Sequence, residues 1–418
     1  MRYKIANVEL APQGNQKIQW AWRAMPVLRS LVERYEPQAP LAGATLAACL
    51  HLEAKTACLL LALKRLGASV RSAGSNPLST QDDVCASLVE QGVEVFSHHG
   101  MTPQEYAAYL EDVLSCEPDV IVDDGADLVA TLVDRMPNLI GKVRGASEET
   151  TSGVKRLKAM QAQNLLKFPV ISVNDADSKY LFDNRYGTGQ SVWDGVMRTT
   201  NMLVAGKTVV IVGYGWCGRG AALRASALGA RVIVTEVAPH RAFEAMMDGH
   251  QVMSMEQAAP LGDIFLTFTG NIHVIRGEHM AVMKDNVLLG NAGHFDVEID
   301  KKALAKLAKE VVCAKPGVDT YVLPDGRRLN LLGEGRLVNL ACGDGHPIEI
   351  MDLSFALQLE SALYAWQHGR ECPAGLMAVP QQIDRGVVET KLASMGVLID
   401  SMTCLLYTSD AADDSTEV

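Results

Sequence analysis

The chain has 418 residues, of which 48% are apolar and 21% charged, a composition typical of a folded protein of two or three domains. Its 38 basic and 49 acidic residues give a net charge of −11, and such a surface repels phosphate backbones and anionic lipids. We therefore expect neither a nucleic-acid partner nor a membrane partner.

The cysteines and the first residues point to a cellular compartment. Nine cysteines are scattered singly without a C-x-x-C pair, which argues against a disulfide framework and a zinc ribbon. No run of eighteen apolar residues occurs, and the start MRYKIANVEL lacks the basic-then-apolar layout of a signal peptide. The sequence thus predicts a cytoplasmic protein that holds no metal.

Residues 1–170 read as helices alternating with short apolar strands. In chain order, the patterns predict a helix over 47–66 that ends at Gly67, then strands at 70–72, 119–122 and 168–173. The last two strands run into the polar segments 123–125 (DDG) and 174–179 (NDADSK). Because α/β proteins place ligand groups at the ends of parallel strands, both segments are candidate site residues.

A glycine-rich turn gives the most specific local signal. A strand at 207–212 is followed by 213–218 (GYGWCG), an alanine-rich helix and a strand at 231–235 that ends at Glu236. This order is typical of a dinucleotide site, where the glycines admit the pyrophosphate, the helix N-terminus donates amides and the acidic residue holds a ribose hydroxyl. Glu236 favours NAD over NADP, a preference that Arg241 weakens. Strands at 264–267 and 287–289 extend this domain over about 185–345.

Eight blocks resemble, in order, the signature blocks of the S-adenosyl-L-homocysteine hydrolase family. They are His51, 76–82, 123–125, 147–151, 182–184, 213–220, 291–300 and 335–346. The resemblance implies an α/β fold in which a Rossmann-type, doubly wound cofactor domain is inserted into a larger α/β substrate domain. The implied boundaries are 1–180 and 347–378 for the substrate domain, 181–346 for the NAD-binding domain and 379–403 for a short C-terminal oligomerisation segment.

Family members use tightly bound NAD to split S-adenosylhomocysteine into adenosine and homocysteine, and they are usually cytosolic homotetramers. Oxidation of the ribose 3′-hydroxyl makes the C4′ proton acidic; homocysteine is then eliminated, water adds and the 3′-ketone is reduced again. NAD is regenerated in every turnover. The scheme needs a base for the 3′-hydroxyl, a base at C4′ and a proton carrier at C5′.

The resemblance assigns the catalytic roles residue by residue. Lys179 takes the 3′-hydroxyl proton, with its pKa lowered by partial burial, and Asp183 lies at i+4 and holds the ribose. Asp124 acts near C4′, while His51 and His294 carry the proton at C5′. The implied substrate-binding residues are Glu53, Lys55, Asn76, Glu149 and His346.

The implied cofactor-binding residues come from five of the blocks and from neighbouring loops. They are Thr150, Thr151, Ser152, Asn184, Gly213, Gly215, Trp216, Cys217, Gly218, Arg219, Gly220, Glu236, Arg241, Thr269, Gly270, Asn271, Ala292, Gly293, His294, Asn339 and His346. Two hinges are expected near 174–183 and 345–351, where the chain enters and leaves the cofactor domain. Closure across them would exclude water from the keto intermediate.

The chain departs from many family members at the position that reads the base. They have Thr-x-Glu or Thr-x-Gln after the first histidine, whereas this chain has Glu53-Ala54-Lys55. A lysine ammonium only donates, which suits the O6 acceptor of hypoxanthine, so S-inosylhomocysteine is an alternative substrate. Glu53 could equally read the base or neutralise Lys55.

The chain also departs at its C-terminus, because it lacks the long tail that in many members reaches a neighbouring subunit. Residues 404–418 read like a translated sequencing adaptor, and we expect them to be a non-native tail. Two other classes of function stay open: an NAD-dependent 2-hydroxyacid dehydrogenase, which would release NADH, and a non-catalytic NAD-binding regulator. Neither accounts for the Asp124, Lys179 and Asp183 blocks.

Overall fold

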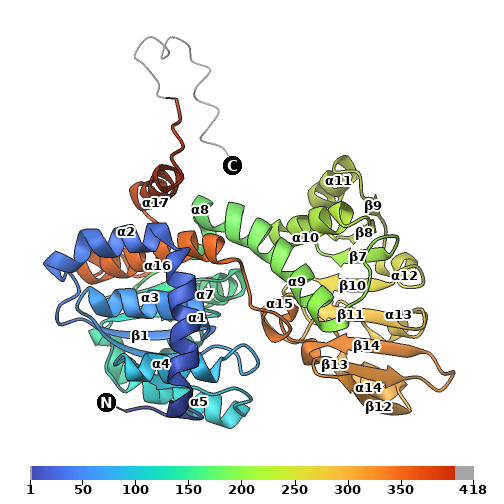
Figure 1. The fold of residues 1–418 in the computed structure, drawn as a ribbon, viewed down its shortest axis with the longest axis horizontal. Coiled ribbons are helices and arrows are strands. Elements are labelled where there is room, and N and C mark those ends of the chain that lie inside the picture. Colours follow the sequence, from blue (N-terminus) through green and yellow to red (C-terminus); the bar gives the residue numbers. More distant parts are fainter. Residues whose placement is uncertain (1, 401–418) are drawn as a thin grey trace.

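The computed structural model describes residues 2–400, which form two α/β units (Figure 1). A seven-stranded sheet, parallel throughout and ordered β15-β6-β5-β4-β1-β2-β3, forms the core of the first unit. Its strands are β1 (Thr45–Leu50), β2 (Ser69–Gly74), β3 (Glu94–Phe96), β4 (Val120–Asp123), β5 (Gly145–Glu148), β6 (Pro169–Ser172) and β15 (Gly375–Ala378). Its helices are α1 (Ala11–Arg23), α2 (Pro26–Tyr35), α3 (Ala54–Arg65), α4 (Asp82–Glu90), α5 (Pro103–Leu114), α6 (Asp127–Arg135), α7 (Thr151–Ala162), α16 (Ile348–His368) and α17 (Gln381–Ser394).

An eight-stranded sheet ordered β12-β13-β14-β11-β10-β7-β8-β9 forms the core of the second unit, and it is parallel from β14 to β9. Its strands are β7 (Thr208–Val212), β8 (Arg231–Thr235), β9 (Gln251–Val252), β10 (Ile264–Thr267), β11 (Val287–Asn291), β12 (Glu310–Lys315), β13 (Val318–Val322) and β14 (Arg328–Leu332). Its helices are α9 (Thr188–Thr200), α10 (Trp216–Ala227), α11 (Pro239–Met247), α12 (Met255–Ala258), α13 (Gly277–Met280), α14 (Lys301–Leu307) and α15 (Val338–Ala341).

Both sheets are doubly wound, which confirms the predicted fold class. The order β9-β8-β7-β10-β11-β14 is the 3-2-1-4-5-6 order of dinucleotide-binding domains, and β3-β2-β1-β4-β5-β6 repeats it in the first unit. The strand order reverses between β7 and β10 and between β1 and β4. Ligands of such sheets bind at these reversals, beyond the carboxyl ends of the strands, so the fold provides two binding crevices.

The predicted strands of both units are confirmed, but the helix predicted over 47–66 is wrong in its first part. Residues Ala47 and Cys49 of β1 pack into one apolar cluster while Leu46 and Leu50 pack into another, on opposite faces of the sheet. A strand buried on both faces has no polar alternation, so its periodicity resembles that of a buried helix. The helix α3 begins only after Glu53, whose carboxylate caps it.

Two crossings connect the units. The first is a helical path through α8 (Asp177–Lys179), the π-helical turn Tyr180–Gly187 and α9, and the second leads from α15 into α16. The expected boundaries at 180/181 and 346/347 fall within these crossings. The expectations for 401–418, including the non-native tail, lie outside the residues that the structure describes. Within 2–400, no helix is long and apolar enough to cross a membrane.

Candidate active site

The carboxyl ends of strands from both sheets line one cavity of about 840 Å³. Every predicted catalytic residue lines it: His51 after β1, Asp124 after β4, Lys179 and Asp183 in the first crossing, and His294 after β11. The two crevices that the strand orders create thus open into the same space. A group bound at one sheet can therefore react with a group bound at the other.

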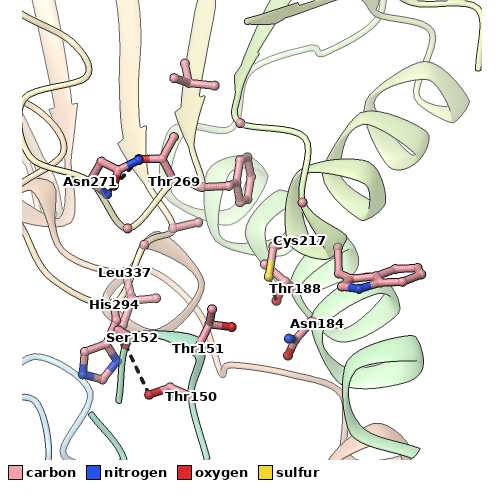
Figure 2. A pocket seen from close by; sticks show the side chains of 18 of the residues that line it. Thr150, Thr151, Ser152, Asn184, Thr188, Cys217, Thr269, Asn271, His294 and Leu337 are labelled. Carbon is pink, nitrogen blue, oxygen red and sulfur yellow. Dashed lines mark hydrogen bonds between the residues drawn. The ribbon is translucent and has the colours of Figure 1, made fainter. Parts of the chain in front are cut away.

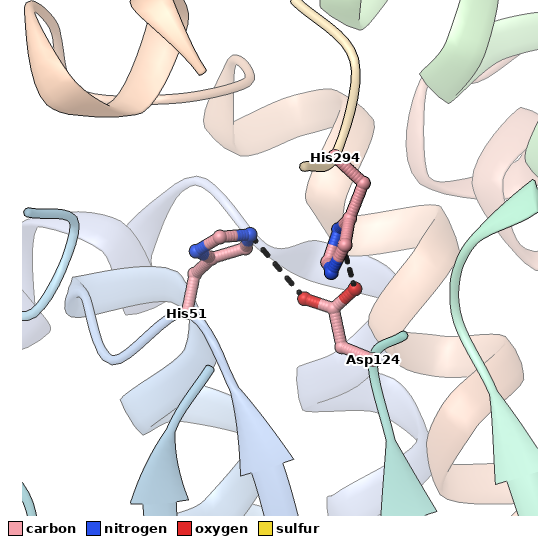
Figure 3. A group of neighbouring side chains, drawn as sticks. All are labelled: His51, Asp124 and His294. Atoms are coloured by element: carbon pink, nitrogen blue, oxygen red, sulfur yellow. Dashed lines mark ion pairs between the residues drawn. The ribbon is translucent and has the colours of Figure 1, made fainter. Parts of the chain in front are cut away.

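Asp124 lies between two histidines that come from different units (Figure 3). One of its carboxylate oxygens is 3.4 Å from Nε2 of His51, and the other is 3.7 Å from Nδ1 of His294. Burial lowers the pKa of His51, and the Asp124 carboxylate opposes this shift only in part. The Nδ1 atom of His51 lies 2.6 Å from the hydroxyl of Ser79, which fixes the ring orientation. His51 is thereby held largely neutral and able to accept a proton.

Among the described residues, the buried Oδ1 atom of Asp124 has no hydrogen-bond partner, although Nδ1 of His294 lies 3.7 Å away. Such an atom is costly unless a ligand satisfies it, so the carboxylate is placed to accept from a bound molecule. The same three side chains hold potential metal-ligating atoms within 4.8 Å of one another. The expectation of no metal therefore stays a prediction.

Lys179 is buried among three side-chain oxygens. Its ammonium donates to Oδ1 of Asn184 (2.8 Å) and of Asp183 (3.2 Å), and Oε1 of Glu149 lies 3.5 Å away. Burial alone would lower the pKa of Lys179, but Asp183 and Glu149 raise it above its ordinary value. The predicted lowering of the Lys179 pKa is therefore wrong, because the two carboxylates outweigh the effect of burial. With its pKa raised in this way, Lys179 is an ammonium ion at neutral pH.

Asp183 connects Lys179 to His346. The Oδ1 atom of Asp183 faces both Nζ of Lys179 and Nδ1 of His346, the latter at 2.9 Å. Burial would raise the pKa of Asp183, but Lys179 and His346 lower it below its usual range. The other ring nitrogen of His346 lies 3.1 Å from the hydroxyl of Thr188. A proton on Lys179 thus has a hydrogen-bonded path towards His346.

The cofactor side of the cavity contains residues from both units (Figure 2). Thr150, Thr151 and Ser152 at the start of α7 face Asn184 and Cys217 across it. All of the predicted cofactor-binding residues line the cavity except Gly218, Arg219 and Gly220. The Oδ1 atom of Asn339 is buried and has no hydrogen-bond partner within the described residues, so it is an acceptor that suits a carboxamide amino group. These residues fit a nicotinamide dinucleotide.

Glu236 is fixed by three backbone amides. The amides of Tyr214 and Val237 donate to it at 2.7 Å and that of Ala238 at 2.9 Å. Burial alone would raise the pKa of Glu236, but these donors lower it, so the carboxylate is ionised and can accept from a ribose hydroxyl. Arg241 lines the same part of the cavity.

Three of the predicted cofactor residues do not line the cavity, and two of them are glycines in close backbone contacts. A Cβ at Gly218 would lie 2.0 Å from the carbonyl oxygen of Gly213, and one at Gly220 would lie 1.7 Å from that of Arg185. These glycines let α10 approach β7 and the π-helical turn. Arg219 stacks on Trp216 and pairs with Glu244, outside the cavity lining. The glycine motif marks a dinucleotide turn but does not separate contact positions from packing positions.

Replacing Gly220 with alanine should destabilise the protein by about 1–3 kcal/mol, because the methyl group has no room against backbone atoms. We expect thermal unfolding to show a lower Tm. The matched control is Gly386→Ala in α17, where a Cβ meets nothing within 4 Å and alanine favours the helix. Equal Tm values for the two variants would contradict the packing role.

Two predicted substrate residues are placed differently from the expectation. Asn76 does not line the cavity: its Oδ1 accepts the amide of Leu78, and its carbonyl accepts from Ser79, the partner of His51. Lys55 does line the cavity, but its ammonium is 2.8 Å from Glu53 and donates to the carbonyl of Asp344 at 2.8 Å. Glu53 therefore neutralises Lys55, one of the options that the sequence left open.

The helix α16 contributes site residues that the sequence does not indicate. Met351 and Phe355 line the cavity from one face of α16, and Ser354 and Gln358 bind Asp183 and Glu149 from behind. The apolar pair at i, i+4 is a signal that is equally typical of a core helix. The strands on which α16 packs are distant in the chain, so the sequence does not show that Met351 and Phe355 line a cavity.

Comparisons with known proteins agree with this geometry. Residues 184–345 match the family model "S-adenosyl-L-homocysteine hydrolase, NAD binding domain", and residues 2–138 match "S-adenosyl-L-homocysteine hydrolase". An adenosylhomocysteinase of Thermococcus kodakarensis is 54% identical, over 96% of this chain and 95% of that protein. An S-inosyl-L-homocysteine hydrolase of Methanopyrus kandleri is 56% identical over the same shares, and an adenosylhomocysteinase of Gloeobacter violaceus is 49% identical over 100% and 98%. The chain belongs to the S-adenosyl-L-homocysteine hydrolase family.

Proposed function

We propose that the protein hydrolyses S-adenosylhomocysteine to adenosine and homocysteine, with NAD as its cofactor. The observation that carries the proposal is the placement of Lys179, Asp183 and Glu149 in the cavity shared by the Asp124–histidine cluster and the dinucleotide crevice. A ribose held there meets a base for its 3′-hydroxyl and a second base for C4′. Bound NAD supplies reversible oxidation at C3′.

Lys179 is suited to the first proton transfer. Its ammonium must lose a proton before it can act as the base, and the shared Asp183 oxygen leads that proton towards His346. A bound nicotinamide carries positive charge, which would lower the pKa of a neighbouring lysine. Glu149 is placed beside Lys179 to accept from the ribose hydroxyls.

Asp124 is suited to abstract the C4′ proton, because its Oδ1 atom is buried and accepts no hydrogen bond from the described residues. His51 and His294 flank it from two sides, so either can exchange a proton with the leaving thiol or with the attacking water at C5′. The cluster is complete only when both units meet. Domain closure would therefore assemble this part of the site.

We also propose that the protein is a cytoplasmic homo-oligomer, a tetramer, that serves the methyl cycle. Near the end of the described chain, Met395 and Leu398 are 66% and 97% exposed, and apolar side chains of this kind are costly unless a partner covers them. Size-exclusion chromatography with light scattering measures the assembly directly. A monomer at micromolar concentration would contradict it.

The base preference gives a test with two substrates. Lys55 is paired with Glu53 at 2.8 Å and donates to the carbonyl of Asp344, so its ammonium is held by protein partners that limit what it can donate to a purine oxygen. We expect S-adenosylhomocysteine to be cleaved at least as fast as S-inosylhomocysteine. Thiol release from each substrate, followed together with absorbance at the NADH band, measures this.

The same assay separates the other functions. A strong preference for the inosyl substrate would make Lys55 the residue that selects the base. Stoichiometric release of NADH without thiol would indicate a dehydrogenase, and bound NAD with no turnover a regulator. Either of the last two results would overturn the proposed hydrolysis.

A further inference from the structure

The helix α16 contacts the site through side chains that do not enter the cavity. Ser354 and Gln358 are fully buried and lie one turn apart on α16. Ser354 donates to Asp183, and Gln358 donates to Glu149, in both cases at 2.6 Å. These two carboxylates flank Lys179. One face of one helix thus holds both acidic neighbours of the proposed base.

The orientation of the Gln358 amide is fixed. The hydroxyl of Ser147 donates to its oxygen at 2.6 Å, which directs its amino group at Oε2 of Glu149. The other oxygen of Glu149, Oε1, is buried, accepts no hydrogen bond from residues 2–400 and lies 3.5 Å from Nζ of Lys179. Gln358 therefore binds Oε2, the Glu149 oxygen farther from Lys179, and leaves Oε1, the oxygen nearer to Lys179, free for a ligand.

Ser354 orients the carboxylate of Asp183 in the same way. It occupies Oδ2, while Oδ1 faces Lys179 and His346. Both donors are uncharged, so they orient the carboxylates without neutralising them. A charged donor at either position would compete with Lys179 for the same carboxylate.

We propose that Gln358 and Ser354 are positioning residues: α16 holds the far oxygens of Glu149 and Asp183 so that the near oxygens face Lys179 and the substrate ribose. This inference rests on the proposed function, since it assigns a task to the same site. Neither residue lines the cavity. They act through the two carboxylates.

Loss of the hydrogen-bond donor on α16 should affect the protonation of Glu149 and of Asp183 differently. Burial raises the pKa of Glu149 to about 7, and its hydrogen bond to Gln358 opposes this shift. The charged groups that face Glu149 are Lys179, Asp183 and Asp124, and α16 adds none. Asp183, in contrast, is held ionised well below neutral pH by Lys179 and His346. Activity should therefore respond to pH differently in the two variants.

Replacing Gln358 with methionine should lower kcat/KM about 10- to 100-fold at pH 7, the typical cost of a lost hydrogen bond to a charged group. Without the donor, the pKa of Glu149 rises, so the acidic limb of the pH profile should move up by about one unit. The loss should be smaller at pH 9, where Glu149 is ionised again. A role in folding alone would lower activity equally at every pH.

Three further variants complete the test on the NAD-loaded enzyme. Ser354→Ala should lower kcat without moving the acidic limb, because Asp183 stays ionised. Ser147→Ala, which frees the Gln358 amide but leaves Gln358 in place, should shift the limb in the same direction as Gln358→Met. Ser361→Ala is the matched control on α16, because its buried hydroxyl has no hydrogen-bond partner in the described part of the chain, and it should behave as wild type.

The outcomes separate the two proposals. If the wild type releases no homocysteine, the proposed function is wrong. If the wild type turns over while folded Gln358→Met and Ser147→Ala both keep its pH profile and kcat/KM, the positioning inference is wrong. If Gln358→Met does not fold, the Ser147→Ala profile decides the result.

Discussion

Replacing Lys179 with alanine should abolish both reduction of the bound NAD and release of homocysteine, with a loss in kcat of about 10³-fold. The side chains of Asp183, Asn184 and Glu149 surround the ammonium of Lys179. Alanine at this position leaves no group there to take the 3′-hydroxyl proton. Absorbance at the NADH band after mixing with S-adenosylhomocysteine follows the first step. A thiol assay follows the whole reaction.

The alanine variant also leaves two buried carboxylates without their cation, so a stability control is needed. Lys391 provides it, because it pairs with the buried Asp352 at 2.9 Å and lies outside the cavity lining. We expect Lys391→Ala to lower the Tm while retaining turnover. A Lys179→Ala enzyme that stays fully active would show that another group is the base.

Replacing Asp124 with asparagine should separate oxidation from elimination. The amide keeps the size of the carboxylate but cannot accept the C4′ proton, so homocysteine release should fall by about 10³-fold. The 3′-oxidation uses Lys179 and should continue. Single-turnover absorbance should therefore show an NADH signal that forms and persists, with no thiol.

A neighbouring aspartate gives the matched control. Asp127 accepts from Tyr106 and Arg156 and does not line the cavity, so Asp127→Asn changes the same functional group nearby without touching the site. We expect it to turn over. If Asp124→Asn prevented the NADH signal as well, Asp124 would act before elimination, in binding or in the first proton transfer.

The pKa of Lys179 shows why a sequence assigns a residue more readily than its charge state. The motif placed Lys179 and Asp183 one turn apart, and the structure confirms their contact at 3.2 Å. Glu149, however, arrives from the end of another strand, and together the two carboxylates reverse the shift that burial alone would cause. A pKa depends on every charge within a few ångströms, most of which are distant in the chain.

Local patterns in the sequence are enough to predict several features of this protein. The strand–glycine–helix order around Gly215, the acidic residue at Glu236 and the polar ends of β4 and β6 follow from short-range rules of turn geometry and strand burial. The cavity-lining placement of His51, Asp124, Lys179, Asp183 and His294 agrees with the residues that the family resemblance named.

Which of these features lie next to one another depends on the three-dimensional fold. His51 and Asp124 are neighbours because β1 lies beside β4 at the reversal of strand order, and His294 reaches them from the other sheet. The fold also makes residues 45–50 a strand and places Gly218 and Gly220 where α10 packs closely against the backbone. It places Gln358 within hydrogen-bond distance of Glu149. Such contacts depend on the order of strands and the path of α16. Both are set by burial of apolar surface over the whole chain, which no local pattern contains.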